Sequence, residues 1–328
     1  MQTEREAILA LYRGERPDFI PEPCSVIKDV VFPGDRYFNP MEFDPYGTGP
    51  DAWGVMWTNQ GPNPMLDGNT VAKGFRLFDD IEDWKKKVRF PDLDHMPVRE
   101  ALLGMAAGMK VDREKHVVSC LILSGAFELM NEMIGFENAL CAFYESPDAV
   151  KEFLNAMCDY KLKCIELAHE YLKPDIIHMH DDWGTNSNMF FSPEMWREFI
   201  KPIEKRYVDR IHELGMLYQH HSCGYITQII PDLIELGVDA IDPINVSNDV
   251  EFIMNNYADK ITIIGALDNQ LYCKPGVTPE QIADDIRKTM DAYVNKGRYL
   301  PYCVPQSETA FAVCCKTIGE YGSQIEIK

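Results

Sequence analysis

The chain has 328 residues, of which 46% are hydrophobic and 26% charged, an ordinary composition for a globular protein with a sizeable core. Its 52 acidic and 32 basic residues give a formal net charge of -20. Because so acidic a surface repels phosphate backbones and anionic lipid heads, we expect neither nucleic acid nor membrane as a partner.

The cysteines and the start of the chain indicate a reducing compartment. Ten cysteines are scattered without the regular spacing of a disulfide framework. The first twenty residues predict an amphipathic helix rather than an uncharged signal segment, and no stretch approaches the roughly 18 apolar residues of a membrane span. We therefore expect a cytoplasmic protein in which most cysteines are small buried hydrophobes.

In chain order, the first helix is followed by a predicted strand, FIPEPC, near residue 20. The region from about 30 to 100 is irregular and rich in Gly, Pro and aromatic residues, which is typical of loops and a hairpin that form a lid over a scaffold. Tyr46, Trp53 and Trp57 lie in this region. They either wall a planar substrate or anchor the loops to the core.

From about residue 100, short apolar runs alternate with helical stretches that often open on Ser-Pro or Thr-Pro and close on Gly. The apolar runs are HVVSCLIL, DIIHMH, MLYQHH, DAIDPI, ITIIGAL and RYLPYC. This alternation predicts a parallel sheet. With FIPEPC and an eighth strand in the irregular region, we predict one (β/α)8 TIM barrel domain over 1–328, with the lid over its mouth. A doubly wound sheet is disfavoured because no G-x-G-x-x-G follows a strand.

Polar side chains gather where the predicted strands run out into loops, which is where a barrel places its catalytic groups. They are His178, His180, Asp181, Asp182, His221, Cys223, Asp242, Asp268 and Cys303.

His221 and Cys223 are the sharpest feature of this set. As alternate residues of an extended backbone they point to the same side. Imidazole and thiolate are the ligands that zinc prefers, and a catalytic zinc keeps one position open. Cys303 is the best-placed third ligand from another strand end. The alternative interpretation is a histidine that caps the next helix beside an inert buried thiol.

The run HMHDDWG is the second feature. Two adjacent carboxylates after a buried strand suit hydrogen bonding or proton transfer. Alternation places His178, His180 and Asp182 on one side and Asp181 on the other. Alternatively, one aspartate caps a helix and a histidine belongs to the core.

Three further cysteines are weaker candidates for a functional role. Cys314 and Cys315 lie on a predicted helix, where neighbours face different directions, so we expect both in the core. Cys24, at the end of the first predicted strand, is a further candidate.

The motifs DDWG, SPEMWREFIKP, HSCG, PDLIELGVDAIDPIN, IGALDNQ and YC, in this order, closely resemble the uroporphyrinogen decarboxylase superfamily. Within it, the likeness is to the zinc- and corrinoid-dependent methyltransferases, and it is strongest from about residue 170 to the end. The resemblance implies a (β/α)8 barrel and an H-x-C…C zinc motif. His221 and Cys223 match its first positions, and Cys303 matches the third but is followed by Val304 instead of a small residue.

The resemblance also implies an activity. The decarboxylases hold their substrate's carboxylates with an arginine-rich segment near the N-terminus, which FIPEPCSVIKDVVFPGDRYFNP lacks, so decarboxylation is disfavoured. The methyltransferases move a methyl group between a small substrate and the cobalt of a corrinoid. This chain lacks the D-x-H-x-x-G signature of corrinoid carriers, so a separate protein must supply the corrinoid.

Two directions of transfer remain open. We favour an O-demethylase-type transfer from a methoxylated aromatic to the corrinoid; the alternative is a methylcorrinoid:thiol (coenzyme M-type) methyltransferase. A non-catalytic zinc protein that binds a corrinoid partner or a small ligand is the alternative from a different class. The expected partners are a corrinoid protein and a small methyl donor or acceptor, and the assembly considered is a homodimer.

The residues predicted for these roles fall into three groups. Those expected to be catalytic are Asp182, His180 and Asp181. Those expected to bind substrate are Trp183, Trp57, Asp242 and His220. Those expected to hold Zn2+ are His221, Cys223 and Cys303.

Overall fold

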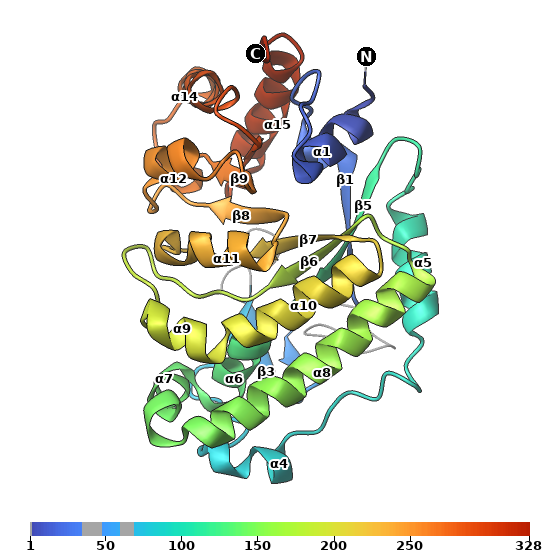
Figure 1. The fold of residues 1–328 in the computed structure, drawn as a ribbon, viewed down its shortest axis with the longest axis vertical. Coiled ribbons are helices and arrows are strands. Elements are labelled where there is room, and N and C mark those ends of the chain that lie inside the picture. Colours follow the sequence, from blue (N-terminus) through green and yellow to red (C-terminus); the bar gives the residue numbers. More distant parts are fainter. Residues whose placement is uncertain (1, 35–47, 60–68) are drawn as a thin grey trace.

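The structure is a computed structural model that describes residues 2–34, 48–59 and 69–328 (Figure 1). Tyr46 lies outside the described residues. Seven parallel strands form one curled sheet with the order β1-β5-β6-β7-β8-β9-β10, so strands that follow one another along the chain lie side by side. They are β1 (Ile27–Val31), β5 (Val117–Ile122), β6 (Ile176–His180), β7 (Leu217–His221), β8 (Ala240–Ile244), β9 (Thr262–Ala266) and β10 (Tyr299–Tyr302).

Helices surround this sheet on its outer side, as expected for a TIM-barrel-like fold, and the predicted fold class is confirmed (Figure 1). The helices are α1 (Glu4–Arg13), α2 (Pro23–Val26), α4 (Trp84–Lys87), α5 (Val98–Gly108), α6 (Ala126–Ile134), α7 (Phe136–Glu145), α8 (Pro147–Tyr171), α9 (Pro193–Phe199), α10 (Lys201–Glu213), α11 (Ile230–Leu236), α12 (Val250–Asn256), α13 (Asn269–Tyr272), α14 (Pro279–Tyr293) and α15 (Glu308–Gly322), with 3-10 turns η1 (Ile81–Asp83) and η2 (Thr227–Ile229).

The start signals read from the sequence act as predicted at two helices. The Thr278 side chain accepts from the backbone of Gln281 in a capping box ahead of Pro279. The Ser192 side chain accepts from the backbone N–H of Met195 and so caps α9 ahead of its own proline. Ser146 precedes α8 without a side-chain cap bond. These caps fix where each helix begins after its strand.

The prediction of a first strand at FIPEPC is wrong. FIPEPC does not form a strand, because Glu22 accepts hydrogen bonds from the backbone of Cys24 and Ser25 and Pro23 occupies the first turn of α2. The strand begins only at Ile27. The eighth strand predicted in the irregular region is also not part of the parallel sheet among the described residues. This region instead holds a separate antiparallel sheet of β2 (Gly49–Pro50), β3 (Met56–Asn59) and β4 (Asn69–Val71).

The aromatic side chains of this small sheet anchor it. Trp57 is buried, and its indole nitrogen donates to Asp51 Oδ2 at 2.8 Å. Trp53 packs edge-on against Tyr160 of α8, with ring centroids 4.7 Å apart. Of the two interpretations, a substrate wall or an anchor, the structure therefore supports a role for both tryptophans in anchoring the loops to the core. A lid over the barrel mouth stays a prediction.

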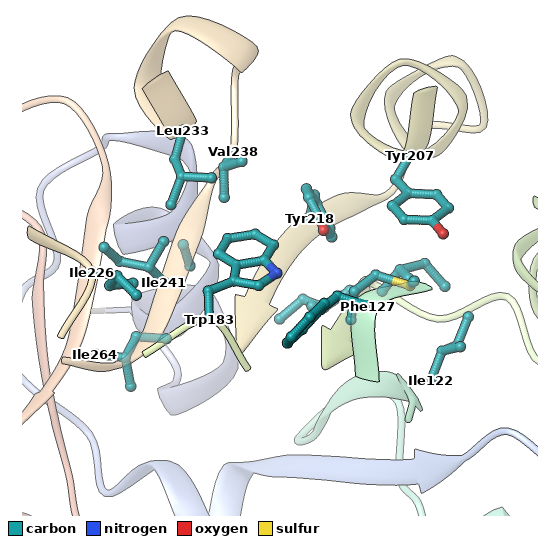
Figure 2. Close-up of a cluster of buried hydrophobic side chains, with 14 of the residues drawn as sticks. Ile122, Phe127, Trp183, Tyr207, Tyr218, Ile226, Leu233, Val238, Ile241 and Ile264 are labelled. Carbon is teal, nitrogen blue, oxygen red and sulfur yellow. The ribbon is translucent and has the colours of Figure 1, made fainter. Parts of the chain in front are cut away.

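The hydrophobic core lies between the sheet and its outer helices. Figure 2 shows part of it, where Trp183 lies among Tyr218, Ile226 and Ile241. Strands β5, β6 and β9 are almost wholly buried, which explains their continuous apolar runs. Among the described residues, no helix has both the length and the apolar character needed to cross a membrane.

Candidate active site at the strand ends

The parallel register brings the polar ends of three strands into one row. His180 of β6 lies opposite His221 of β7, and His221 lies opposite Asp242 of β8. Because all three strands run the same way, these side chains emerge at the carboxyl end of the sheet. The prediction that polar strand ends converge is thus supported for these three residues.

His221 is oriented by a carboxylate on one side and faces two possible ligands on the other. Its Nδ1 lies 3.4 Å from Asp242 Oδ2. Its Nε2 lies 3.5 Å from Cys223 Sγ and 3.7 Å from Asp182 Oδ1. A carboxylate that holds one ring nitrogen of a histidine directs the other nitrogen toward a metal. The arrangement therefore places the thiol of Cys223 and a carboxylate oxygen of Asp182 each within 3.7 Å of Nε2 of His221.

The two separations from His221 Nε2 are close to those expected around a tetrahedral zinc ion. Bond lengths of about 2.0–2.1 Å to nitrogen and about 2.3 Å to sulfur place the two ligand atoms about 3.6 Å apart, and a nitrogen and a carboxylate oxygen about 3.4 Å apart. The observed distances of 3.5 Å and 3.7 Å are close to both. Asp182 Oδ1 also accepts the backbone N–H of Cys223 at 2.6 Å, which fixes the carboxylate against the backbone of this residue.

His180 borders this donor set. Its ring stacks on that of His221, with centroids 4.1 Å apart, and its Nδ1 lies 2.8 Å from Glu128 Oε2. One donor atom each of His180, Asp182 and His221 lie within 4.8 Å of one another. Glu128, in the first turn of α6, was not predicted as a site residue from the sequence. Its position shortly after the end of a strand could have indicated it, and the structure shows that it is buried.

Asp181 points the other way, as the alternation predicted. It is 3% exposed and accepts hydrogen bonds from the backbone of Phe127 and Glu128 at the start of α6. Burial and the neighbouring Glu128 raise the pKa of Asp181 well above its ordinary value. The structure thus gives Asp181 a structural position at the start of a helix, apart from the donor set.

Three of the four predicted substrate contacts are buried. His220 is fully buried, lies 3.1 Å from the Tyr218 hydroxyl, and stacks on Trp183 at 3.9 Å between ring centroids. Trp183 is itself in the core, and Trp57 belongs to the small antiparallel sheet. Asp242, also buried, lines a cavity.

That cavity, called the inner cavity below, has a volume of about 270 Å³ inside the sheet. Its polar wall consists of Asp29, His178, Gln219 and Asp242, and its remaining wall is formed by Pro23, Cys24, Ile27, Ile264, Leu300, Tyr302, Val304 and Phe311. No described residue of this lining is a lysine or an arginine.

The polar wall is a connected network. Asp242 Oδ1 lies 2.9 Å from His178 Nε2 and accepts from the Gln219 amide at 2.8 Å. Burial alone would lower the pKa of His178, but the charge and hydrogen bond of Asp242, with help from Asp29, raise it to about 9. Burial would conversely raise the pKa of Asp242, and the charges of His178 and His221 instead hold it well below its ordinary value.

A larger outer cavity of about 600 Å³ opens beside the ends of β7, β8 and β9. Cys223, Asp268 and Asn269 lie on its wall, and Val304 lines both cavities. The predicted ligand Cys223 therefore faces a space that a reactant can enter.

Cys303 is not brought to His221 and Cys223 in this structure. It is buried, its Sγ donates to Asn269 Oδ1 at 2.8 Å, and it lies 3.4 Å from Cys314 Sγ. The hydrogen bond with Cys314 and burial raise the pKa of the Cys303 thiol. Cys303, like Cys223, belongs to none of the described groups whose donor atoms lie within 4.8 Å of one another. The role of Cys303 as a metal ligand stays a prediction, and Asp182 Oδ1 is a third donor that lies 3.7 Å from Nε2 of His221.

The chain belongs to the uroporphyrinogen decarboxylase (URO-D) family, whose sequence model matches residues 67–300. The superfamily resemblance read from the sequence is thus confirmed. A solved structure of a methyltransferase from Methanosarcina mazei shares the fold, with a TM-score of 0.68 and 13% sequence identity, over 98% of this chain and 99% of that one. No curated protein sequence matches the chain at a significant level.

Proposed function

We propose that the protein is a zinc-dependent methyltransferase that moves a methyl group between a small substrate and the cobalt of a separate corrinoid protein. The observation that carries this proposal is the donor set of His221, Cys223 and Asp182, with Asp242 behind the imidazole, at the carboxyl ends of the strands. The fold shared with the M. mazei methyltransferase supports the same activity class.

His221 and Cys223 would hold the ion, with Asp182 or Cys303 as the third ligand. The donor set of imidazole, thiolate and carboxylate suits zinc. When bound, zinc would act as a Lewis acid, which polarises an ether oxygen or favours a thiolate. Asp242 orients His221 for this role, and Glu128 orients His180 beside it.

The inner cavity supports an uncharged substrate. Its described lining carries two carboxylates and no lysine or arginine, so it offers an anionic group no positive side chain apart from His178, which is already paired with Asp242. Tyr302 and Phe311 supply aromatic surface. These features favour a methoxylated aromatic as methyl donor over a thiol that carries an anionic group. We infer that His180 hydrogen-bonds the substrate oxygen.

The corrinoid partner would dock over the outer cavity, because Cys223 lines that cavity at the carboxyl end of the sheet. A reducing cytoplasm suits this chemistry, and it is supported by the ten cysteines, which are scattered without the regular spacing of a disulfide framework.

The test combines the purified, zinc-loaded chain with a corrinoid protein and watches the cobalt absorbance. Reduced corrinoid is offered methoxyaromatics, methylamines and methanol in turn, and methylated corrinoid is offered thiols. We expect methylation of the cobalt with a methoxyaromatic. Demethylation by a thiol alone would instead establish the reverse direction, and no change with any compound would contradict the methyl-transfer proposal.

A further inference from the structure

The sheet has a seam between its two edge strands, β1 and β10, which no described backbone ladder joins. The segment before β1 and helix α15 meet at this seam. The backbone N–H of Ile20 donates to the carbonyl of Gly322 at 3.1 Å. A Cβ added at Gly319 would lie only 3.4 Å from Glu22 Cβ, so the helix and the segment are in close contact. Figure 1 shows α15 and the N-terminal helix at the same end of the molecule.

Three potential metal ligands converge at this contact. One donor atom each of Glu22, Cys24 and Cys315 lie within 4.8 Å of one another. Glu22 is 9% exposed, and the two cysteines are half-buried. Because Cys24 precedes β1 and Cys315 lies on the last helix, only the closure of the fold brings the two thiols together.

The charge of this cluster is unbalanced. Glu22 makes no ion pair with any described residue; its oxygens accept the backbone N–H groups of Cys24 and Ser25 at 2.7 and 2.8 Å, which hold the carboxylate in place without neutralising it. A buried anion beside two thiols is therefore a place where a cation would be bound strongly.

We propose that Glu22, Cys24 and Cys315 form a second metal site, separate from the donor set at His221, for a borderline divalent ion such as Zn2+. Two thiolates and one carboxylate are ligands that zinc accepts, and water completes four-coordination. Binding releases the thiol protons, as zinc binding to cysteines does. The bound ion ties the segment before β1 to α15 and so clamps the seam of the sheet.

The experiment counts metal ions in the full chain. The protein is reduced, demetallated, loaded with zinc, freed of excess ion, and analysed for bound zinc per chain. We expect Cys24→Ser, Cys315→Ser and Glu22→Gln each to bind one equivalent less than the unchanged chain. Cys141→Ser, at an exposed cysteine outside both sites, serves as the matched control and should keep the full amount.

A second readout separates this site from the first. In a His221→Ala background zinc should still raise the melting temperature, and adding Cys315→Ser should abolish that rise. With Co2+ in place of zinc, thiolate-to-cobalt absorption should persist in Cys223→Ser, because two thiolates remain at the seam. Circular dichroism of each metal-free variant shows whether it folds, and Glu22→Gln, which keeps an oxygen for the cap, guards against misfolding of the cysteine variants.

Two results would overturn the proposal. One is a zinc content that none of the three substitutions lowers. The other combines two observations: the reduced His221→Ala variant binds no zinc, and oxidation links Cys24 to Cys315 as a disulfide. The pair would then be a redox couple instead of a metal site.

Discussion

Asp242 divides its two carboxylate oxygens between two histidines, and the geometry of the site depends on that division. Oδ1 engages His178 and Gln219, and Oδ2 lies 3.4 Å from Nδ1 of His221. A buried carboxylate that contacts two imidazoles holds their ring orientations together. One substitution at this position therefore disturbs both the inner cavity and the proposed metal centre.

Asp242→Asn should weaken zinc binding at His221 by about 10- to 100-fold, since loss of the carboxylate behind a ligating histidine usually has this effect. Zinc affinity is measured by competition with a chelator. Asp291→Asn, at a carboxylate of α14 that binds the Tyr321 hydroxyl, is the control and should leave the affinity unchanged. An Asp242→Asn protein with full affinity would show that His221 needs no such support.

The identity of the third ligand is a separate prediction. As arranged in the structure, Asp182→Asn should lower the zinc affinity more than Cys303→Ser does, because Asp182 Oδ1 lies 3.7 Å from His221 Nε2 while Cys303 binds Asn269. Cys158→Ser, at a buried cysteine of α8, controls for the loss of a core thiol. The opposite order would establish Cys303 as the ligand and show that its side chain rotates toward the ion when the metal binds.

Among the elements, α6 depends on a residue outside it. Asp181 receives two backbone N–H groups at the start of this helix, whose own N-terminal residue, Gly125, has no capping side chain. A Cβ added at Gly125 would lie 2.3 Å from Asp181 Cβ, so the fit leaves no space. The carboxylate thus joins α6 to the end of β6.

Asp181→Ala should lower the free energy of unfolding by about 1–3 kcal/mol, because it leaves buried backbone donors without a partner. Urea denaturation measures the change, and zinc content should stay the same. Asp148→Ala, at an exposed aspartate in the first turn of α8, is the control. Normal stability together with lost methyl transfer would restore the catalytic role first predicted for Asp181.

A second contact between elements makes stability depend on pH. Asp232 of α11 accepts hydrogen bonds from Arg197 of α9 at 2.9 Å and Lys201 of α10 at 2.8 Å. Burial would raise the pKa of Asp232, but these two cations outweigh burial and hold it below its ordinary value of 3.8. A carboxyl group whose pKa is lowered by folding stabilises the fold above its unfolded pKa and loses that contribution as the pH falls through the folded pKa.

Asp232→Asn should therefore cost about 1 kcal/mol at neutral pH, a modest amount because Arg197 is partly exposed. The difference from the unchanged chain should shrink as the pH falls below about 4, where Asp232 itself becomes protonated. Urea unfolding at several pH values measures it. A difference that stays constant down to about pH 2 would show that charge does not cause the effect.

For the whole molecule, the closure of the sheet depends on how closely its first and last segments approach. A Cβ at Gly322 would lie 2.1 Å from the carbonyl oxygen of Ile20, a backbone atom that cannot move aside cheaply. Contacts at the seam join residues some 300 positions apart. The integrity of the barrel wall therefore rests on a few tight contacts between the two ends of the chain.

Gly322→Ala should lower the free energy of unfolding by about 1–3 kcal/mol, because the added methyl group forces the seam apart. Gly104→Ala in α5 is the matched control, since no atom lies within 4 Å of its added Cβ, and it should be neutral or slightly stabilising. Thermal and urea unfolding measure both. Equal stability of the two variants would show that the seam accommodates the added methyl group without loss of unfolding free energy.

The parallel strands after residue 100 could be predicted from the sequence because each is a short apolar run followed by a helical stretch. Alternation likewise separated Asp181 from Asp182 correctly. FIPEPC failed because a local cap at Glu22 competes with the strand, and apolar content alone does not reveal that competition. His220 and Trp183 were expected at the substrate, but they stack on each other in the core.

The sequence by itself determined the strand–helix alternation of the barrel and the pairing of His221 with Cys223, because these depend on periodicity or on neighbours two residues apart. The family followed from the resemblance of its motifs. The tertiary structure decided which groups meet from distant elements: Asp242 behind His221, Glu128 beside His180, Cys303 against Cys314, and Cys24 against Cys315. Such meetings depend on register between strands and on the packing of helices against the sheet. Neither the register nor the packing can be predicted from the pattern of residues along a single element.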